Sequence, residues 1–320
     1  MSETEGQMVV GKPKPTGGPE LKQIPGIRSP MGPRAFERRL AQDPYATLTG
    51  LRDRFGDVVQ VSGGFGQASV FLFGPEANAF VLSQHKELFR HTEAYQSLLP
   101  VDGETALLLT DGGEYARRRQ LVQPALRHHR LDPYLDVMVR EADRMIDGLA
   151  GVITIDLDKR LRVGTSRTMI TCLLGAHLSE RADEIAATLQ PALEFANLPP
   201  NKRRRVMVVG TAYYNAVKAR TLIDRIIDAE IDRRNALPRQ QRPTDDVLAA
   251  LLAGHEGITI TIPEVRDQVV SLLAAGIDPT STALSWIMDE ILRDTAAWNQ
   301  AAAEVREVVG TRVLTLEDLP

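Results

Sequence analysis

The sequence predicts a mainly α-helical protein with a small β-sheet, an α+β fold. A helical pattern runs from Thr261 to Arg293, and apolar residues recur at helical spacing in 135–149 and 222–231. Strand-forming residues concentrate in one short stretch, 58–73. With 320 residues, of which 43% are hydrophobic, the chain can bury a large core.

The strand-forming stretch predicts a β-hairpin. Segments 58–61 and 69–73 contain β-branched and aromatic residues, and Gly63, Gly64 and Gly66 lie between them. Glycine supplies the backbone freedom that a tight turn needs. We therefore expect two antiparallel strands joined at these glycines.

Two later segments have the spacing of helices with one apolar face. The residues of these faces are Leu135, Met138, Val139, Ala142, Ile146 and Leu149 in the first, and Leu222, Ile223, Ile226, Ile227 and Ile231 in the second. Because such faces pack against other elements, we expect both to lie in a core.

The longest helical pattern begins with a capping box, in which Thr261 is the expected N-cap and Glu264 follows three residues later. The helix is therefore expected to begin near Pro263. Continued to Arg293, it has roughly 30 residues and a length of about 45 Å, enough to cross a domain.

The middle of this helix combines apolar and polar residues. Segment 269–277 is apolar on nearly every side, whereas an acid, a proline and three hydroxyls follow at 278–282. Pro279 has no amide hydrogen for the carbonyl of Ala275, so the helix should kink or open there. Two interpretations are open: a structural helix whose hydroxyls bond to the preceding turn, or a groove for a small ligand.

The segment AGIDPT in this helix resembles the oxygen-binding helix of the cytochrome P-450 family, haem-thiolate monooxygenases with the pattern Ala/Gly-Gly-x-Asp/Glu-Thr-Thr/Ser. Ala275, Gly276, Asp278 and Thr280 match, and Pro279 takes the place of the first threonine. The resemblance implies that the four matching residues form the catalytic site. It also implies that Asp278 is the acid of a proton relay, with Thr280, or a water at the carbonyl freed by the proline, in the role of the missing threonine.

A second segment, DGGEYARRRQLVQPALRHHRL, resembles the family's helix beside the haem, Asp-Gly-x-x-His/Trp-x-x-x-Arg followed by Pro-Ala-Phe. The matching residues are Asp111, Gly112, Arg119, Pro124 and Ala125. The resemblance implies that Tyr115 and Arg119, one helical turn apart, hold the propionates of haem b by charge-assisted hydrogen bonds. Tyr115 replaces His or Trp and can donate through its hydroxyl.

Further arginines, Arg117, Arg118, Arg127 and Arg130, lie in the same segment. They form either a solvated basic face or a docking surface for an acidic electron donor, which the resemblance implies to be of the ferredoxin type. The net charge of -4, and the lack of a recognition motif near the basic run 202–205, argue against a nucleic-acid partner.

The sequence lacks the family's iron-ligand motif, Phe-x-x-Gly-x-x-x-Cys-x-Gly. Around the one cysteine, Cys172, the places of Phe and Gly are taken by Thr165, Thr168 and Leu174. Cys172 lies in an apolar helical stretch, which predicts a buried structural thiol. We therefore assign no metal ligand and expect the axial cysteine of the haem to be absent from this chain.

The last residues, 314–320, resemble the family's linker ahead of its Glu-x-x-Arg helix. Glu290 and Arg293 spell that motif inside the long helix, where pairs three residues apart are common, and we interpret them as coincidence. We expect a fragment whose P-450-like fold is incomplete at the C-terminus, with a flexible tail over 1–23 and a single domain over 24–320.

The resemblance implies a monooxygenase that inserts one oxygen atom of O2 into an apolar small molecule, using haem iron and electrons from a redox partner. Without the axial cysteine, this chain by itself is expected to be inactive. The alternative is a non-catalytic remnant or a protein that binds a hydrophobic ligand. The sequence shows neither a signal peptide nor a membrane anchor, and its single cysteine fits a reducing compartment, which predicts a cytoplasmic protein.

The sequence lacks the residues that three other kinds of site require. Asp245 and Asp246 are a lone pair rather than the spaced aspartates of a magnesium site, and we interpret them as helix caps. His128 and His129 are adjacent and point to different sides of a helix. A Gly-x-Ser-x-Gly nucleophile motif does not occur.

Overall fold

The computed structural model describes residues 24–27, 32–61, 69–127, 131–149, 151, 153–199 and 202–318, and the side chains of 32–35 and 37 are not described. The chain divides into two compact units, unit 1 over 1–86 and unit 2 over 87–320, each of which is described by itself. The expected tail over 1–23 lies outside the described residues, and the expected single domain over 24–320 stays a prediction.

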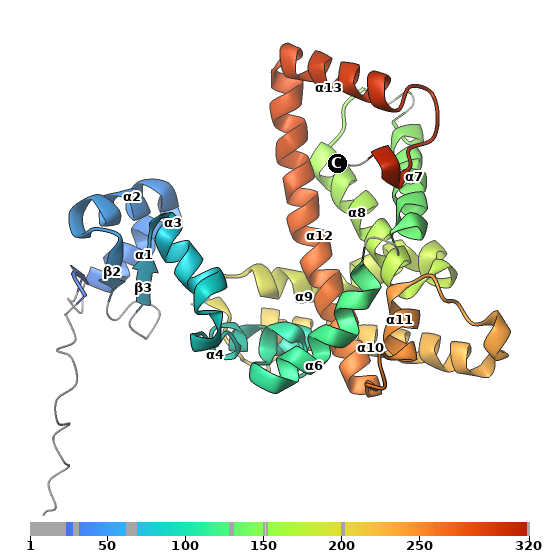
Figure 1. Ribbon diagram of the computed structural model, residues 1–320, viewed down its shortest axis with the longest axis horizontal. Helices are drawn as coiled ribbons and strands as arrows, with labels where there is room; N and C mark the ends of the chain where they lie inside the picture. Colours follow the sequence, from blue (N-terminus) through green and yellow to red (C-terminus); the bar gives the residue numbers. More distant parts are fainter. Residues whose placement is uncertain are drawn as a thin grey trace, which may run out of the picture. The chain divides into compact units, whose positions relative to one another are not determined.

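Unit 1 combines a three-stranded sheet with helices (Figure 1). Its elements are β1 (Gly26–Ile27), α1 (Gly32–Gln42), α2 (Pro44–Phe55), β2 (Val58–Val61), β3 (Ser69–Leu72), α3 (Gly74–Ala79) and a π-helical turn (Phe80–Gln84). Strand β2 lies between β1, to which it is parallel, and β3, to which it is antiparallel, with Val59 opposite Phe71. The predicted hairpin is confirmed, and its three turn glycines lie outside the described residues.

A small core stabilises unit 1. Phe36, Leu51, Val59 and Val61 are buried in it, and the ring of Phe71 meets that of Phe36 edge-on at a centroid distance of 5.4 Å. The two valines alternate along β2, so they point to the same face of the sheet. That face is the one covered by α1 and α2, which supply the phenylalanine and the leucine.

Unit 2 is helical in the part that the structure describes. Its α-helices are α4 (Thr92–Tyr95), α5 (Leu99–Asp102), α6 (Gly112–Val122), α7 (Asp132–Asp147), α8 (Leu157–Leu174), α9 (Ala182–Asn197), α10 (Ala212–Ala236), α11 (Val247–Ala253), α12 (Ile262–Arg293) and α13 (Thr295–Val308). Within the described residues, no helix combines the length and the apolar character that crossing a bilayer requires.

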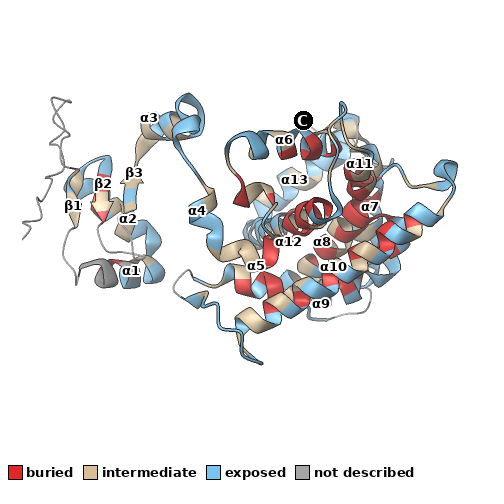
Figure 2. Cartoon of the chain, turned by 90° about the horizontal axis from the view of Figure 1, so that it is seen from below, coloured by how far each residue is buried: buried red, intermediate tan, exposed pale blue. Residues whose placement is uncertain are grey.

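The core of unit 2 lies where α12 packs against α8, α10 and α11. Figure 2 shows the buried residues concentrated on these helices. Ile170 of α8, Ile223 of α10, Leu251 of α11 and Leu273 of α12 are among its fully buried side chains. The prediction of a mainly helical fold with one small sheet is confirmed.

Helix α12 agrees with its sequence prediction at the N-terminus. The amide of Thr261 donates to Glu264 Oε2 at 2.9 Å and the amide of Glu264 donates to Thr261 Oγ1 at 3.4 Å, which completes the capping box. The helix spans 32 residues and stays helical through Pro279, so it is not interrupted there, and the expected kink stays a prediction. Ala275 and Pro279 are both exposed, and the carbonyl of Ala275 accepts no hydrogen bond from residue 279, which is proline.

The two predicted apolar faces are buried to different extents. On α10 the face lies in the core apart from Leu222, which is 39% exposed. On α7, Met138 and Ile146 are 47% and 58% exposed and Ala142 is exposed as well, so the predicted core face is wrong for these three residues. In the described part of the chain α7 packs chiefly against α8, and the side turned away from α8 meets solvent.

Candidate active site

A cavity of about 570 Å³ lies beside the polar residues of α12. Residues from α8, α9 and α12 line it: Arg162, Leu193, Ala196, Asn197, Ala274, Asp278, Pro279, Thr282, Ala283 and Trp286. Most of them are small or apolar, and the charged groups gather at Asp278. Because Pro279, Thr282 and Trp286 are exposed, the cavity is open to solvent. The position of this cavity agrees with one of the two interpretations of 278–282, a groove for a small ligand.

Two side chains across this cavity hold Asp278. Its Oδ1 accepts a hydrogen bond from Arg162 of α8, and its Oδ2 accepts one from the side-chain amide of Asn197 of α9 at 2.5 Å. The side chain of Asp278 is 15% exposed, so water reaches the carboxylate. Sequence reasoning missed Arg162 and Asn197, because they lie 116 and 81 residues away along the chain.

The other predicted catalytic residues of α12 do not gather around Asp278. Thr280 is exposed, and because two residues rotate about 200° around an ideal helix, it faces away from Asp278. Gly276 packs against α8, where a Cβ on it would lie 2.1 Å from Cε of Met169. Ala275 is exposed. A proton relay between Asp278 and Thr280 stays a prediction.

Tyr115 and Arg119, the predicted propionate-binding pair, come together on α6. Arg119 Nη1 donates to the hydroxyl of Tyr115 at 2.7 Å, and the guanidinium carbon lies 5.9 Å from the ring centroid. Tyr115 is half-buried and Arg119 is exposed. Among the described residues, no carboxylate forms an ion pair with Arg119. The pair therefore presents a cation and a hydroxyl that can bind a negatively charged group.

His91, just before α4, contacts this pair. Its ring meets the Tyr115 ring edge-on at a centroid distance of 5.3 Å. Its Nε2 lies 3.2 Å from the carbonyl oxygen of Leu107, and its Nδ1 lies 3.2 Å from Oδ1 of Asp111. Sequence reasoning missed His91 because the residue belongs to neither of the matched motifs.

Two of the remaining arginines of α6 are paired inside unit 2. Arg118 is 8% exposed, and its Nε donates to Oε1 of Glu264 of α12 at 3.1 Å. Arg117 contacts the same carboxylate. Both interpretations of the basic residues, a solvated face and a docking surface, are therefore wrong for Arg118. Arg127 is exposed, and Arg130 lies outside the described residues.

Cys172 lies in the core, on α8, and is 7% exposed. Burial raises the pKa of the Cys172 thiol to about 12, although the charge of Arg140 acts in the opposite direction. The group is therefore a thiol at neutral pH, and it packs among the core side chains. Within the described residues, no three His, Cys, Asp or Glu side chains come together in a way that could hold a metal ion.

Asp245 and Asp246 precede α11, and the predicted role of a helix cap is confirmed for Asp246. The amide of Ala249 donates to Oδ1 of Asp246 at 2.8 Å, so Asp246 caps the helix. The same carboxylate pairs with Arg234, which is 3% exposed. His128 and His129 lie outside the described residues.

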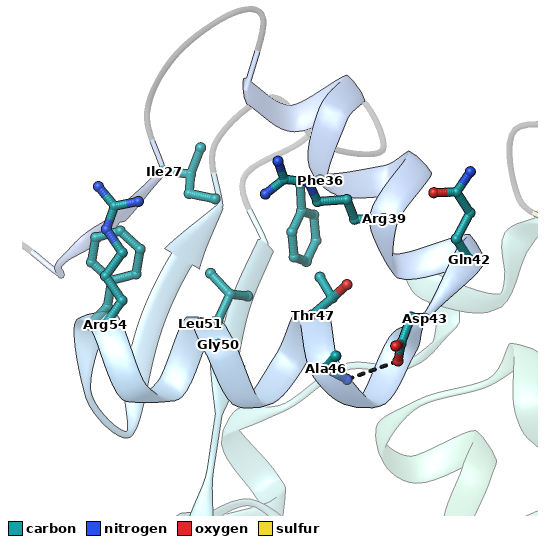
Figure 3. Close-up of a pocket in the computed structure, with 11 residues that line it drawn as sticks. Ile27, Phe36, Arg39, Gln42, Asp43, Ala46, Thr47, Gly50, Leu51 and Arg54 are labelled. Carbon is teal, nitrogen blue, oxygen red and sulfur yellow. Dashed lines mark hydrogen bonds between the residues drawn. The ribbon is translucent and has the colours of Figure 1, made fainter.

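A separate cavity of about 560 Å³ lies within unit 1, between α1, α2 and β1 (Figure 3). Figure 3 shows the side chains of Phe36 and Leu51 between the helices, Arg39 alongside Phe36, and Arg54 near the end of α2. None of the predicted site residues lines this cavity. The cavity beside Asp278 is therefore the candidate active site.

Comparison with known sequences identifies relatives. The family model described as Cytochrome P450 matches residues 29–320. The protein assigned as cytochrome P450 139 in Mycobacterium tuberculosis is 37% identical over 257 residues, which cover 79% of this chain and 59% of that protein. Cyclooctatin synthase of Streptomyces melanosporofaciens is 29% identical over 290 residues, which cover 88% of this chain and 61% of that protein.

A solved structure has the same fold. The retinoic acid-bound cyanobacterial CYP120A1 aligns with a TM-score of 0.76 and 21% sequence identity, over 89% of this chain and 63% of that chain. The chain thus spans 59%, 61% and 63% of the lengths of these three relatives. Because the family model matches nearly the whole sequence, the chain belongs to the cytochrome P450 family.

Proposed function

We propose that the protein containing this chain is a haem-dependent monooxygenase that inserts one oxygen atom of O2 into an apolar small molecule. Membership of the family supports the reaction class. The observation that carries the proposal is the Tyr115–Arg119 pair on α6, which offers a cation and a hydroxyl and has no carboxylate partner among the described residues.

The donor set fits one part of haem and does not fit another. A propionate is a carboxylate, and an arginine fork beside a hydroxyl is a suitable partner for it. The iron needs an axial ligand, and Cys172 does not fit because it is a buried thiol on α8. This supports the expectation that the axial cysteine is not among the residues of this chain. A bound haem would supply the oxygen activation, and a thiolate ligand would donate the electron density that favours it.

The chain's own contribution to the chemistry is proton supply at Asp278. Arg162 and Asn197 donate to the two different oxygens of its carboxylate, so the group is held in one orientation. Its partial exposure at the cavity lets water exchange protons with it. The proposed next proton carrier is Thr280, or a water at the carbonyl of Ala275, to which Pro279 donates no hydrogen bond. Gly276 gives close packing against α8 rather than a reacting group.

Substrate, redox partner and compartment are part of the same proposal. The cavity beside Asp278 has an apolar side formed by Leu193, Ala196, Ala283 and Trp286, which favours an apolar substrate. The proposed electron donor is of the ferredoxin type and the proposed compartment is the cytoplasm. A non-catalytic protein that binds a hydrophobic ligand is the second candidate, and the buried thiol of Cys172 is the observation that favours it.

The test is haem binding by the longest reading frame that contains this chain. We expect the reduced protein under carbon monoxide to show the thiolate-type Soret band, and residues 1–320 alone to lack it. Tyr115→Phe and Arg119→Ala should weaken haem retention, whereas Arg127→Ala, which removes an exposed arginine outside the pair, should not. Equal retention in all three variants would contradict the role of the pair, and absence of the band in the longest frame would favour the second candidate.

A further inference from the structure

Gln268 of α12 is a buried amide that binds the backbone of a loop. It is 1% exposed, and its neighbours Val269 and Val270 are buried apolar residues. Its Nε2 donates to the carbonyl oxygen of Thr105 at 2.5 Å, and its Oε1 accepts from the amide of Leu107 at 3.3 Å. A buried amide destabilises a protein unless its groups are hydrogen-bonded, and both ends of this one bond to the loop.

Asp267, next to Gln268, strengthens the same contact. Its Oδ2 accepts from the amide of Thr105 at 2.9 Å and from the hydroxyl of Thr105 at 2.6 Å. Gly103 lies so near that a Cβ on it would be 2.0 Å from Oδ1 of Asp267. The loop over 103–107 therefore cannot move relative to α12 without losing hydrogen bonds.

The loop in turn fixes His91. The carbonyl oxygen of Leu107 lies 3.2 Å from His91 Nε2, within hydrogen-bonding distance, and that nitrogen donates to it in the tautomer with the hydrogen on Nε2. Asp111, the N-cap residue of α6, holds the backbone of His91, whose amide donates to Oδ1 at 3.1 Å. The ring so held meets Tyr115 edge-on at 5.3 Å, a geometry in which aromatic rings attract each other.

We propose that Gln268 and His91 are positioning residues for the Tyr115–Arg119 pair. Gln268 fixes the loop, the loop fixes His91, and His91 fixes the ring of Tyr115, whose hydroxyl accepts from Arg119. Both residues act through Tyr115 rather than by touching a bound group. That the bound group is a haem carboxylate rests on the proposed function, whereas the positioning itself does not.

Gln268→Leu tests the first link of this chain of contacts, because leucine removes both hydrogen bonds and keeps a side chain of similar size. We expect the amide of Leu107 to exchange with deuterium about tenfold faster, as the loss of one net hydrogen bond implies. The ring signals of Tyr115 in NMR spectra, assigned through Tyr115→Phe, test the last link. We expect them to shift toward their positions in His91→Ala.

Three control variants separate positioning from a general loss of stability. Leu251→Ala removes a core side chain of α11 and destabilises the protein. Because Leu251 takes no part in the contacts between Gln268, His91 and Tyr115, the Tyr115 signals should stay unchanged. Gln190→Leu repeats the amide change on α9, where the amide donates to Glu194, and should also leave them unchanged. His91→Phe keeps an aromatic edge, so its Tyr115 signals should lie closer to the wild type than those of His91→Ala.

Haem titration of the same variants separates this inference from the proposed function. Shifted Tyr115 signals with weaker haem binding in Gln268→Leu support both. Shifted signals with unchanged haem affinity support the positioning and overturn the assignment of the pair to haem. Tyr115 signals that stay unchanged in Gln268→Leu, or that change equally in Leu251→Ala, overturn the positioning.

Discussion

Arg118 of α6 and Glu264 of α12 form a buried ion pair, with 3.1 Å between Nε and Oε1 and side chains that are 10% and 7% exposed. The second carboxylate oxygen of Glu264 accepts from the amide of Thr261 at 2.9 Å. One carboxylate therefore caps α12 and also attaches α6, the helix of the Tyr115–Arg119 pair, to the start of the helix that carries Asp278.

We predict that Glu264→Gln lowers the free energy of unfolding by about 2–4 kcal/mol, because Arg118 then loses its buried anion and keeps only the exposed carboxylate of Glu114. A glutamine side chain can still take part in a capping box, so the decrease in the free energy of unfolding comes from the missing charge and not from a missing cap. Urea unfolding measures this free energy. Glu114→Gln is the control: this carboxylate also meets Arg118 but is 59% exposed, and its loss should cost less than about 1 kcal/mol. Equal losses in the two variants would contradict the prediction.

The same pair predicts how stability depends on pH in acid. Burial raises the pKa of Glu264, but hydrogen bonds from Thr261, Arg117 and Arg118 outweigh it and lower the pKa from 4.5 to about 2. The folded-state pKa lies below the unfolded value, so the stabilisation is complete above 4.5 and is lost as the pH falls to about 2. The stability difference between wild type and Glu264→Gln should therefore shrink over this interval. A constant difference would show that the charge of Glu264 is not its source.

The features that the sequence predicted correctly are formed by residues that lie close together along the chain. The capping box at Thr261 and Glu264, the antiparallel strands β2 and β3 and the cap at Asp246 each depend on residues near one another in the sequence, and the structure has all three. The hydroxyl contact between Tyr115 and Arg119 also spans a single helical turn. Interactions within one element follow from spacing alone.

Contacts between elements explain what the sequence could not predict. The buried partner of Arg118 lies 146 residues away, and the partner of Asp278 on α8 lies 116 residues away. The apolar spacing of α7 predicted a core face, yet Met138 and Ile146 are exposed because burial depends on which helices cover each side. Likewise, the motif places Asp278 and Thr280 close in sequence but on different sides of the helix.

The glycine of the loop beside Asp267 should tolerate no side chain. Gly103 has φ 86° and ψ 162°, a conformation that only glycine adopts readily, and a Cβ on it would lie 2.0 Å from the Asp267 carboxylate. We predict that Gly103→Ala lowers the free energy of unfolding by about 3 kcal/mol or more. Gly112, with φ 60° and open space around its Cβ position, is the matched control, and Gly112→Ala should cost about 1–2 kcal/mol. Equal losses would show that the close approach to Asp267 has no effect.

Asp278→Asn tests the proposed proton supply in the haem-loaded protein. Asparagine keeps the shape of the side chain and removes the acid, so turnover should fall by about tenfold to hundredfold while haem content stays unchanged. Asp289→Asn on the same helix, where the carboxylate is 43% exposed and pairs with Arg293, should leave turnover unchanged. Haem content and turnover measured on the same samples distinguish the roles, since loss of haem in Asp278→Asn would make Asp278 a structural residue.

Asp102, at the C-terminal end of α5, should destabilise the folded protein at neutral pH. It is 3% exposed, and burial raises its pKa from 3.8 to about 6, with Arg220 lowering it and Asp267 raising it. The folded state thus holds the proton more tightly than the unfolded chain, so this residue's contribution to stability falls as the pH rises from 3.8 to about 6.

We therefore predict that Asp102→Asn raises the free energy of unfolding at pH 7 by on the order of 1–3 kcal/mol, because asparagine needs no charge in the buried site. At acid pH, where the aspartate is protonated in both states, the gain should vanish. Asp136→Asn, an exposed aspartate on α7, is the control and should change stability little at either pH. Urea unfolding at both pH values gives the comparison. A loss of stability at pH 7 would mean that the attraction between Asp102 and Arg220 exceeds the cost of burying the carboxylate.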